Sequence, residues 1–135
     1  MTAMRVLLAD DSDLILERLQ DMVHAYRQVE IVGSLKDGTE TLEALRFLKP
    51  DLAIVDIKMP GLSGLEVLNE IRKEDKILKF IILTFYSSDY YRDLAIHAGV
   101  DYFFSKADDF DRLSLVVKEM VEKEGIYKRI KAASS

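Results

Sequence analysis

The sequence has no cysteine among its 135 residues and only two histidines. The absence of cysteine excludes disulfide bonds, thiolate metal sites and a cysteine nucleophile, and a zinc site would need mostly carboxylate ligands. No apolar run approaches the roughly 18 residues of a membrane-spanning helix, and the amino-terminal run is too short for a signal peptide. We therefore expect a cytoplasmic protein with no zinc centre and no membrane insertion.

The chain also has no excess of basic residues. Nineteen Lys and Arg residues stand against 24 Asp and Glu residues, which gives a formal charge of −5. Direct binding to nucleic acid depends on cationic side chains that displace counterions from phosphates, so we do not expect it here. A composition of 49% hydrophobic and 32% charged residues over this length is typical of one globular domain.

Short apolar runs alternate with helical stripes along the chain. The apolar runs, each typical of a strand buried on both faces, are 6–9, 31–33, 52–55, 80–83 and 102–104. The helical stripes are 15–26, 42–48, 65–71, 94–98 and 113–120. This (βα)5 pattern predicts the α/β class, with a doubly wound, parallel, five-stranded sheet covered by helices on both faces.

Local signals mark the ends of these elements. Ser63-x-x-Glu66 and Asp37-x-x-Glu40 have the pattern of capping boxes, and Asp89 and Asp109 are candidate N-caps. No shift in composition divides the chain, so we expect one domain over residues 1–125. Residues 126–135 then form either an extension of the last helix or a tail, with no output domain.

Polar residues stand where the apolar runs stop. They are Asp10 and Asp11, Asp56, Thr84, and Ser105 with Lys106. Ligands of such sheets bind outside the carboxyl ends of the strands, so these side chains are expected at one rim. Taken singly, the acids before the first helix can be a helix cap, and a threonine or lysine at a strand end is most often a solvated residue.

The converging acids predict a magnesium site with phosphoryl chemistry. Mg²⁺ is usually held by one or two carboxylates together with water and phosphate oxygens, which leaves one acid free. Asp56, at the end of a buried strand, is then placed to attack a phosphoryl group and form an aspartyl phosphate. Lys106 and Thr84 can bind the phosphoryl oxygens.

From Met4 to Glu122 the chain resembles the receiver domain of bacterial two-component response regulators, which has a flavodoxin-like fold. The match lies in Leu7–Ser12, in Pro50–Gly64, in Ile81–Thr84 and in Ala98–Lys106. Each segment alone is a weak signal, but together and in this order they form a strong one.

The resemblance implies that Asp56 accepts a phosphoryl group from a histidine kinase or a histidine phosphotransfer protein. It places Mg²⁺ on Asp10, Asp11, Asp56 and the backbone carbonyl of Lys58. Thr84 and Lys106 would bind the phosphoryl oxygens.

The resemblance also implies a switch, in which the Thr84 hydroxyl moves inward and Phe103 turns into the space that it leaves. The fourth helix, fifth strand and fifth helix would then signal to an output protein or domain, or form a homodimer. The chain would be a signalling domain that catalyses only its own phosphorylation and dephosphorylation.

Three positions depart from the family pattern. Ala107 follows the lysine where proline is usual, so a trans bond is expected between Lys106 and Ala107. Phe85 and Tyr86 follow Thr84 where a small residue is usual, which predicts slower phosphorylation and hydrolysis. The switch aromatic is Phe103 instead of the commoner tyrosine, so it has no hydroxyl to satisfy when it is buried.

Three other functions stay open at this point. Asp11-Ser12-Asp13 resembles the paired aspartates of haloacid dehalogenase-type hydrolases, although that function leaves Asp56 without a role. A flavodoxin-like nucleotide binder is disfavoured because the first loop is acidic and would repel phosphate. A receiver-like interaction module that works without phosphorylation is the third, and the complete set of polar residues argues against it.

Overall fold

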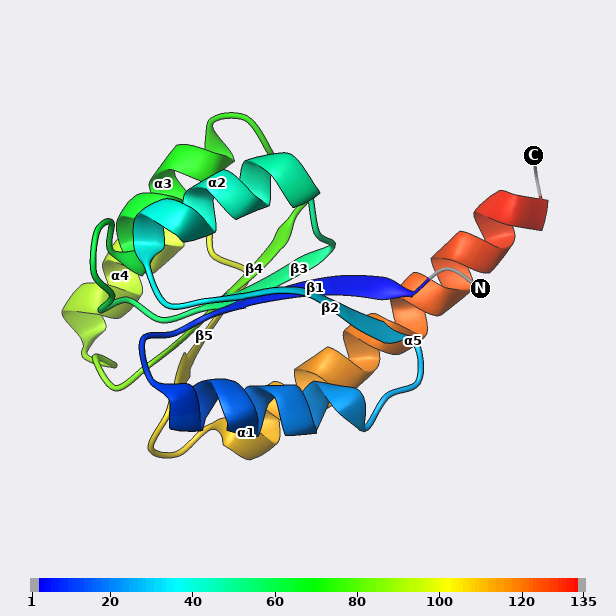
Figure 1. Ribbon diagram of the computed structural model, residues 1–135, viewed down its shortest axis with the longest axis horizontal. Helices are drawn as coiled ribbons and strands as arrows, with labels where there is room; N and C mark the ends of the chain where they lie inside the picture. Colours follow the sequence, from blue (N-terminus) through cyan, green and yellow to red (C-terminus); the bar gives the residue numbers. More distant parts are fainter. Residues whose placement is uncertain (1–2, 134–135) are drawn as a thin grey trace.

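The computed structural model describes residues 3–133, with side chains through residue 124 and at Ala133. Within residues 3–133, five strands alternate with five helices (Figure 1). The strands are β1 (Met4–Ala9), β2 (Val29–Leu35), β3 (Leu52–Val55), β4 (Lys79–Thr84) and β5 (Tyr102–Ser105). The helices are α1 (Asp13–His24), α2 (Gly38–Leu48), α3 (Gly64–Arg72), α4 (Asp89–Ala98) and α5 (Phe110–Ala133).

The strands form one parallel sheet in the order β2-β1-β3-β4-β5, which confirms the predicted α/β class and topology. Figure 1 shows α1 and α5 on one face of the sheet and α2 and α3 on the other. Strand β2 is longer than the expected 31–33, because its partly exposed ends continue the pairing with β1.

Successive residues of the central strands pack into two separate cores. Leu7, Ala53 and Ile82 belong to the core under α2, α3 and α4, whereas Val6, Leu8 and Ile54 belong to the core under α1 and α5. Burial on both faces explains why these strands are apolar runs without alternation. A charged residue at the end of such a strand therefore stands out from the apolar pattern of the strand itself.

Two of the four predicted helix starts lie where they were expected. Ser63 and Glu66 form the reciprocal capping box, whereas one half of the box predicted at Asp37 forms, with its side chain accepting from the Glu40 amide. The prediction that Asp89 is an N-cap was wrong, because Ser88 takes that position and Asp89 is the first helical residue of α4.

Asp109 directly precedes α5, and its backbone carbonyl accepts the Leu113 amide. Its side chain, however, accepts the Ser105 amide at 2.8 Å instead of an amide in the first turn of the helix. This carboxylate therefore closes the loop that follows β5.

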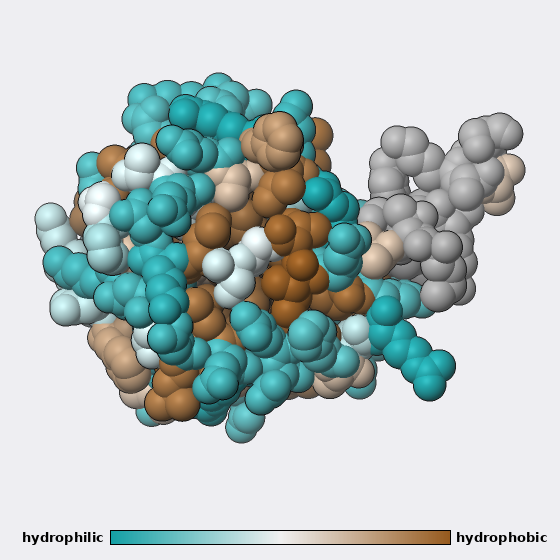
Figure 2. Space-filling model, in the orientation of Figure 1, coloured by the Kyte–Doolittle hydropathy of each residue, from teal (hydrophilic) through white to brown (hydrophobic). Residues whose placement is uncertain are grey.

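The exposed surface varies over the molecule. Figure 2 shows apolar residues gathered between α1 and α2, where the edge strand β2 runs, and hydrophilic residues over both helices. The last helix, α5, continues to Ala133 and projects beyond the sheet (Figure 1). Among residues 3–133, no helix combines the length and the apolar character needed to cross a bilayer.

Candidate functional site

The site lies where the strand order reverses, at the carboxyl ends of β1 and β3. The strand after β1 in the chain, β2, lies on one side of β1, and β3 lies on the other. The loops that leave β1 and β3 therefore diverge at this point, which is where ligands of such sheets bind. Ala9 pairs with Val55, and the Asp56 amide donates to the Ala9 carbonyl at 2.9 Å. This register places the acids after β1 beside the acid after β3.

The structure brings together all three predicted acids. Asp10, Asp11 and Asp56 each have a carboxylate oxygen within 4.8 Å of the others. Asp10 is 1% exposed and Asp56 is 6% exposed, whereas Asp11 faces solvent. The cluster therefore has a buried floor and one open side, and its oxygen donors suit a hard divalent cation.

Lys106 provides a positive charge on this floor. Its ammonium donates to Asp10 Oδ2 at 2.6 Å and to Asp56 Oδ2 at 2.7 Å, and the lysine is 7% exposed. The other oxygen of each carboxylate accepts a backbone hydrogen bond. The Ser12 amide donates to Asp10 Oδ1 at 2.9 Å, and the Ile57 amide donates to Asp56 Oδ1 at 2.7 Å. The sequence pointed to Lys106 as a ligand of phosphoryl oxygens but gave no sign of its contact with both acids.

Burial and hydrogen bonds act against each other on the pKa values of Asp10 and Lys106. Burial raises the pKa of Asp10, and the hydrogen bonds from Lys106 and Ser12 offset that rise only in part, while the neighbouring Asp56 carboxylate adds to it. Burial alone would lower the pKa of Lys106, but its hydrogen bonds to Asp10 and Asp56 outweigh burial and raise it. Lys106 is thus cationic at neutral pH, and Asp10 binds a proton more readily than an ordinary aspartate does.

Thr84 is fully buried at the end of β4, and its hydroxyl accepts the Tyr86 amide at 3.1 Å. Thr84 pairs with Ser105, and its carbonyl accepts the Lys106 amide at 2.9 Å. Within residues 3–133, this hydroxyl is bonded to its own loop and to no acidic side chain. Its backbone is therefore tied to Lys106, while its side chain is held by the β4–α4 loop.

Two glycines hold the loop that follows Asp56 against the neighbouring helices. The Gly64 amide donates to the Ile57 carbonyl at 2.8 Å, and the Gly38 amide donates to the Pro60 carbonyl at 2.9 Å. A Cβ atom on Gly64 would lie 2.0 Å from the Asp56 carbonyl oxygen, and one on Gly38 would lie 1.7 Å from the Leu62 carbonyl oxygen. Only glycine allows these close approaches.

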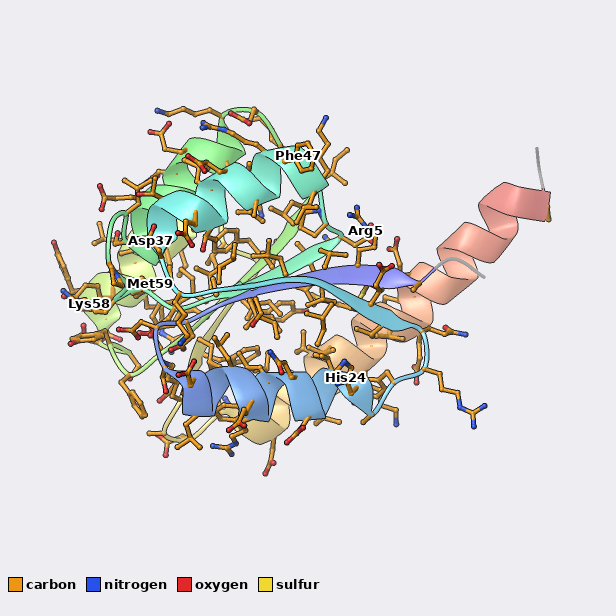
Figure 3. All side chains as sticks on the ribbon, viewed as in Figure 1. Arg5, His24, Asp37, Phe47, Lys58 and Met59 are labelled. Carbon is orange, nitrogen blue, oxygen red and sulfur yellow. The ribbon has the colours of Figure 1, made fainter. Side chains whose placement is uncertain are left out.

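Lys58 extends from the same loop at the carboxyl end of the sheet, on the side of Asp37 and Met59, whereas Arg5 lies toward the opposite end (Figure 3). The Lys58 ammonium lies 5.1 Å from the centre of the Tyr86 ring. The Lys58 side chain therefore reaches the β4–α4 loop, and only its backbone carbonyl stays a candidate ligand.

Phe103 is 7% exposed and lies in the core under α2, α3 and α4. The guanidinium of Arg92, on α4, lies 4.8 Å from the centre of its ring and donates to the Phe103 carbonyl at 3.5 Å. Sequence reasoning missed Arg92, because no pattern along the chain predicts which residue of α4 faces β5.

The bond between Lys106 and Ala107 is trans, as expected. Ala107 donates its amide to Ser105 Oγ at 3.1 Å, and the Asp109 side chain accepts the Ser105 amide. These two hydrogen bonds fix the turn after Lys106 without the proline that is usual in the resembled family.

The profile of the family described as "Response regulator receiver domain" matches residues 6–118. The chain belongs to this family. The haloacid dehalogenase-type and nucleotide-binding interpretations are thereby set aside. Asp56, the acid that the former left without a role, is one of two buried carboxylates that contact Lys106.

Two of the relatives are named as regulators and a third is named as an enzyme. The uncharacterized transcriptional regulatory protein YvfU of Bacillus subtilis is 30% identical over 91% of this chain and 62% of its own length. The response regulator GacA of Pseudomonas viridiflava is 31% identical over 76% of this chain and 48% of its own length. A protein-glutamate methylesterase of Methanospirillum hungatei is 41% identical over 63% of this chain, but over only 25% of its own length. The receiver thus spans less than two-thirds of these relatives.

Solved receiver structures have the same fold. The response regulator domain of Thermotoga maritima CheB has a TM-score of 0.78 and 28% identity, covering 90% of this chain and 95% of that one. A LuxR-family DNA-binding response regulator from Staphylococcus aureus has a TM-score of 0.79 and 27% identity, covering 86% and 97%. The receiver fold of this chain is therefore shared over nearly all of these structures.

Proposed function

We propose that this receiver accepts a phosphoryl group on Asp56 from the phosphohistidine of a histidine kinase or a histidine phosphotransfer protein. The observation that carries the proposal is the buried Asp56 carboxylate, held by Lys106 and flanked by Asp10 and Asp11. An acid in this position has no packing role, since it ends a strand that is otherwise apolar on both faces. Beyond its own phosphorylation and dephosphorylation, we propose no enzymatic activity for the domain.

The acidic cluster fits Mg²⁺. Three carboxylates at the ends of two strands supply the oxygen donors that this ion prefers, and one of the carboxylates, that of Asp11, is open to solvent. In this proposal Asp10, Asp11 and Asp56 hold the ion together with the backbone carbonyl of Lys58. When bound, it neutralises charge on the phosphoryl oxygens during transfer.

The positions of the side chains support the following transfer step. An Asp56 carboxylate oxygen attacks phosphorus, the new O–P bond forms as the P–N bond of the donor breaks, and the electron pair leaves with the imidazole nitrogen. Lys106 exchanges its contact with Asp56 for a phosphoryl oxygen and stays paired with Asp10. The Thr84 hydroxyl turns from its loop and donates to another phosphoryl oxygen.

That movement of Thr84 supplies the switch. When the Thr84 hydroxyl turns away, its hydrogen bond from the Tyr86 amide breaks. The β4–α4 loop then loses one of the hydrogen bonds that hold it. Phe103 lies on the neighbouring strand, and its ring can adjust to the vacated space without leaving a polar atom unsatisfied. The resulting change on α4, β5 and α5 is the local event that a partner reads.

In this proposal the signalling response is produced by a partner protein, by another domain or by a second copy of the receiver. We propose a receiver over residues 1–125 and an extension over residues 126–135, with signalling or homodimer formation through α4, β5 and α5. The S. aureus structure is a DNA-binding regulator, and one relative is named as a methylesterase. Contact with DNA, or an enzymatic activity, would belong to an output domain and not to this acidic receiver.

Intact mass tests the proposal directly. Incubation with Mg²⁺ and acetyl phosphate is expected to add one phosphoryl group to the parent protein, and a chelator should prevent the addition. The Asp56→Asn variant should gain nothing, because the amide oxygen is a poor nucleophile. If the variant is labelled as strongly as the parent, the acceptor is wrong. If the parent gains nothing, a phosphorylation-independent interaction module becomes the better description.

Mg²⁺ should also stabilise the unphosphorylated protein. At ten times its dissociation constant, a ligand of the folded state stabilises by about 1.4 kcal/mol, which corresponds to roughly 3 to 5 °C in Tm for a domain of this size. Asp11→Asn should remove most of that shift by taking away the exposed carboxylate of the cluster. Asp21→Asn, at an exposed position of α1, is the control. Equal shifts in all three proteins, measured by thermal unfolding with and without Mg²⁺, would contradict a site on the acidic cluster.

A further inference from the structure

The ring of Phe85 lies next to the acceptor and is not used by the core. Phe85 follows Thr84 directly, at the carboxyl end of β4, and is 63% exposed. The Lys106 ammonium lies 5.2 Å from the centre of the ring, and the same ammonium is 2.7 Å from Asp56 Oδ2. The exposed aromatic ring and the proposed acceptor oxygen therefore share the Lys106 ammonium as a neighbour.

The neighbouring tyrosines do not cover this ring. Tyr86 turns toward Lys58 and packs edge-on against Tyr91, with 5.7 Å between ring centres. Tyr91 in turn packs against Tyr90, with 5.2 Å between ring centres. Among the side chains that the structure describes, Phe85 pairs with no other ring, and its ring lies beside the Lys106 ammonium. It thus has an apolar surface available beside the reacting group.

We propose that Phe85 is a platform for the leaving group of the phosphoryl donor, and that it makes the receiver favour donors in which phosphorus is bonded to an aromatic nitrogen heterocycle. This inference rests on the proposed function of Asp56. In-line attack places the leaving group on the far side of phosphorus from Asp56, next to the rim of the site on which Phe85 stands. An imidazole ring there can pack against Phe85, whereas ammonia or acetate as a leaving group offers no aromatic face.

The chemistry needs no further reactant. For protonated phosphoimidazole, the O–P bond to Asp56 forms, the P–N bond breaks, and neutral imidazole departs with the electron pair. The contact acts while the donor ring is being positioned, so it raises the rate with ring-bearing donors only. Aromatic pairs contribute enough to change a rate constant by about two- to tenfold.

The test compares two small donors on four proteins. Rates of phosphorylation are measured from quenched samples by intact mass, with Mg²⁺ and either phosphoimidazole or phosphoramidate, for the parent, Phe85→Ala, Phe85→Leu and Tyr90→Ala. Tyr90 is 68% exposed on α4 and serves as the matched exposed aromatic. The ratio of the two rates measures the contribution of the donor ring, because any effect that is common to both donors cancels.

The expected result is that Phe85→Ala lowers the ratio of the phosphoimidazole rate to the phosphoramidate rate by about two- to tenfold. Phe85→Leu should lower it as well, and Tyr90→Ala should leave it unchanged. A Phe85→Ala change that multiplies both rates by the same factor would show that the ring only shields the acceptor, and the platform would be rejected while the function of Asp56 stands. A parent that neither donor phosphorylates would overturn both proposals.

Discussion

Replacing Gly64 with alanine is expected to lower the free energy of unfolding by about 3 kcal/mol or more, a loss at the upper end for overpacked sites. The new Cβ would lie 2.0 Å from the Asp56 carbonyl oxygen and 2.8 Å from its carbonyl carbon. These are backbone atoms of the strand end that carries the acceptor, so they cannot move aside as the tip of a flexible side chain can. Either α3 or the Asp56 backbone must shift.

Urea unfolding of the parent and the variant measures this loss. Gly33→Ala is the matched control, because its Cβ would meet the Leu7 side chain at 3.3 Å, on the edge strand β2. That contact can relax, and the change should stay within about 1 kcal/mol. The same displacement of Asp56 should slow phosphorylation of whatever Gly64→Ala protein remains folded. A variant as stable as the parent would show that the packing of α3 on this loop is loose.

Replacing Lys106 with methionine is the second change with a large expected effect. It removes the ammonium that both Asp10 and Asp56 contact, and leaves two buried carboxylates close together. Breaking a buried pair in this way costs about 3 to 5 kcal/mol. We expect that loss at neutral pH without Mg²⁺, together with a severe loss of phosphorylation. The control is Lys79→Met, since Lys79 is exposed and lies 3.9 Å from Asp101 in a surface pair worth at most about 1 kcal/mol.

Two further measurements distinguish this ion pair from a loss of packing. The pKa of Lys106 is raised on folding, so its stabilising contribution is complete below its unfolded value of about 10.4 and disappears as the pH rises through the folded value. The difference in stability between the parent and Lys106→Met should therefore shrink at strongly alkaline pH. Mg²⁺ should also raise the Tm of the variant more than that of the parent, because no ammonium competes for the carboxylates. A difference that is independent of both pH and Mg²⁺ would mean that the lysine stem, and not its charge, stabilises the site.

Much of the site could be predicted from the sequence because strand ends in a parallel sheet meet at one edge. Apolar runs that end in Asp10, Asp56 and Thr84 place these residues on a common rim once the strands are known to be parallel. The capping box at Ser63 was equally predictable, because it depends on residues only three positions apart.

Predictions failed where a side chain had a choice of partners. Asp89 was expected to cap α4, but Ser88 takes the N-cap position, and Asp109 directs its carboxylate to the Ser105 amide. Both segments contain several polar residues that can begin a helix, and the paths of the loops select among them. A local pattern identifies the candidates for such a role without ranking them.

The sequence by itself determined the order of the elements, the burial of the sheet on both faces and the set of residues at its carboxyl edge, because each depends on periodicity or on a chain position within one element. Only the tertiary structure decided which groups touch. The contact of Lys106 with both acids, the stacking of Arg92 on Phe103 and the exposed ring of Phe85 beside Lys106 depend on the register and twist of separate strands. Those contacts join residues that lie far apart in the chain or on neighbouring loops, and their distances are set by the packing of the whole domain.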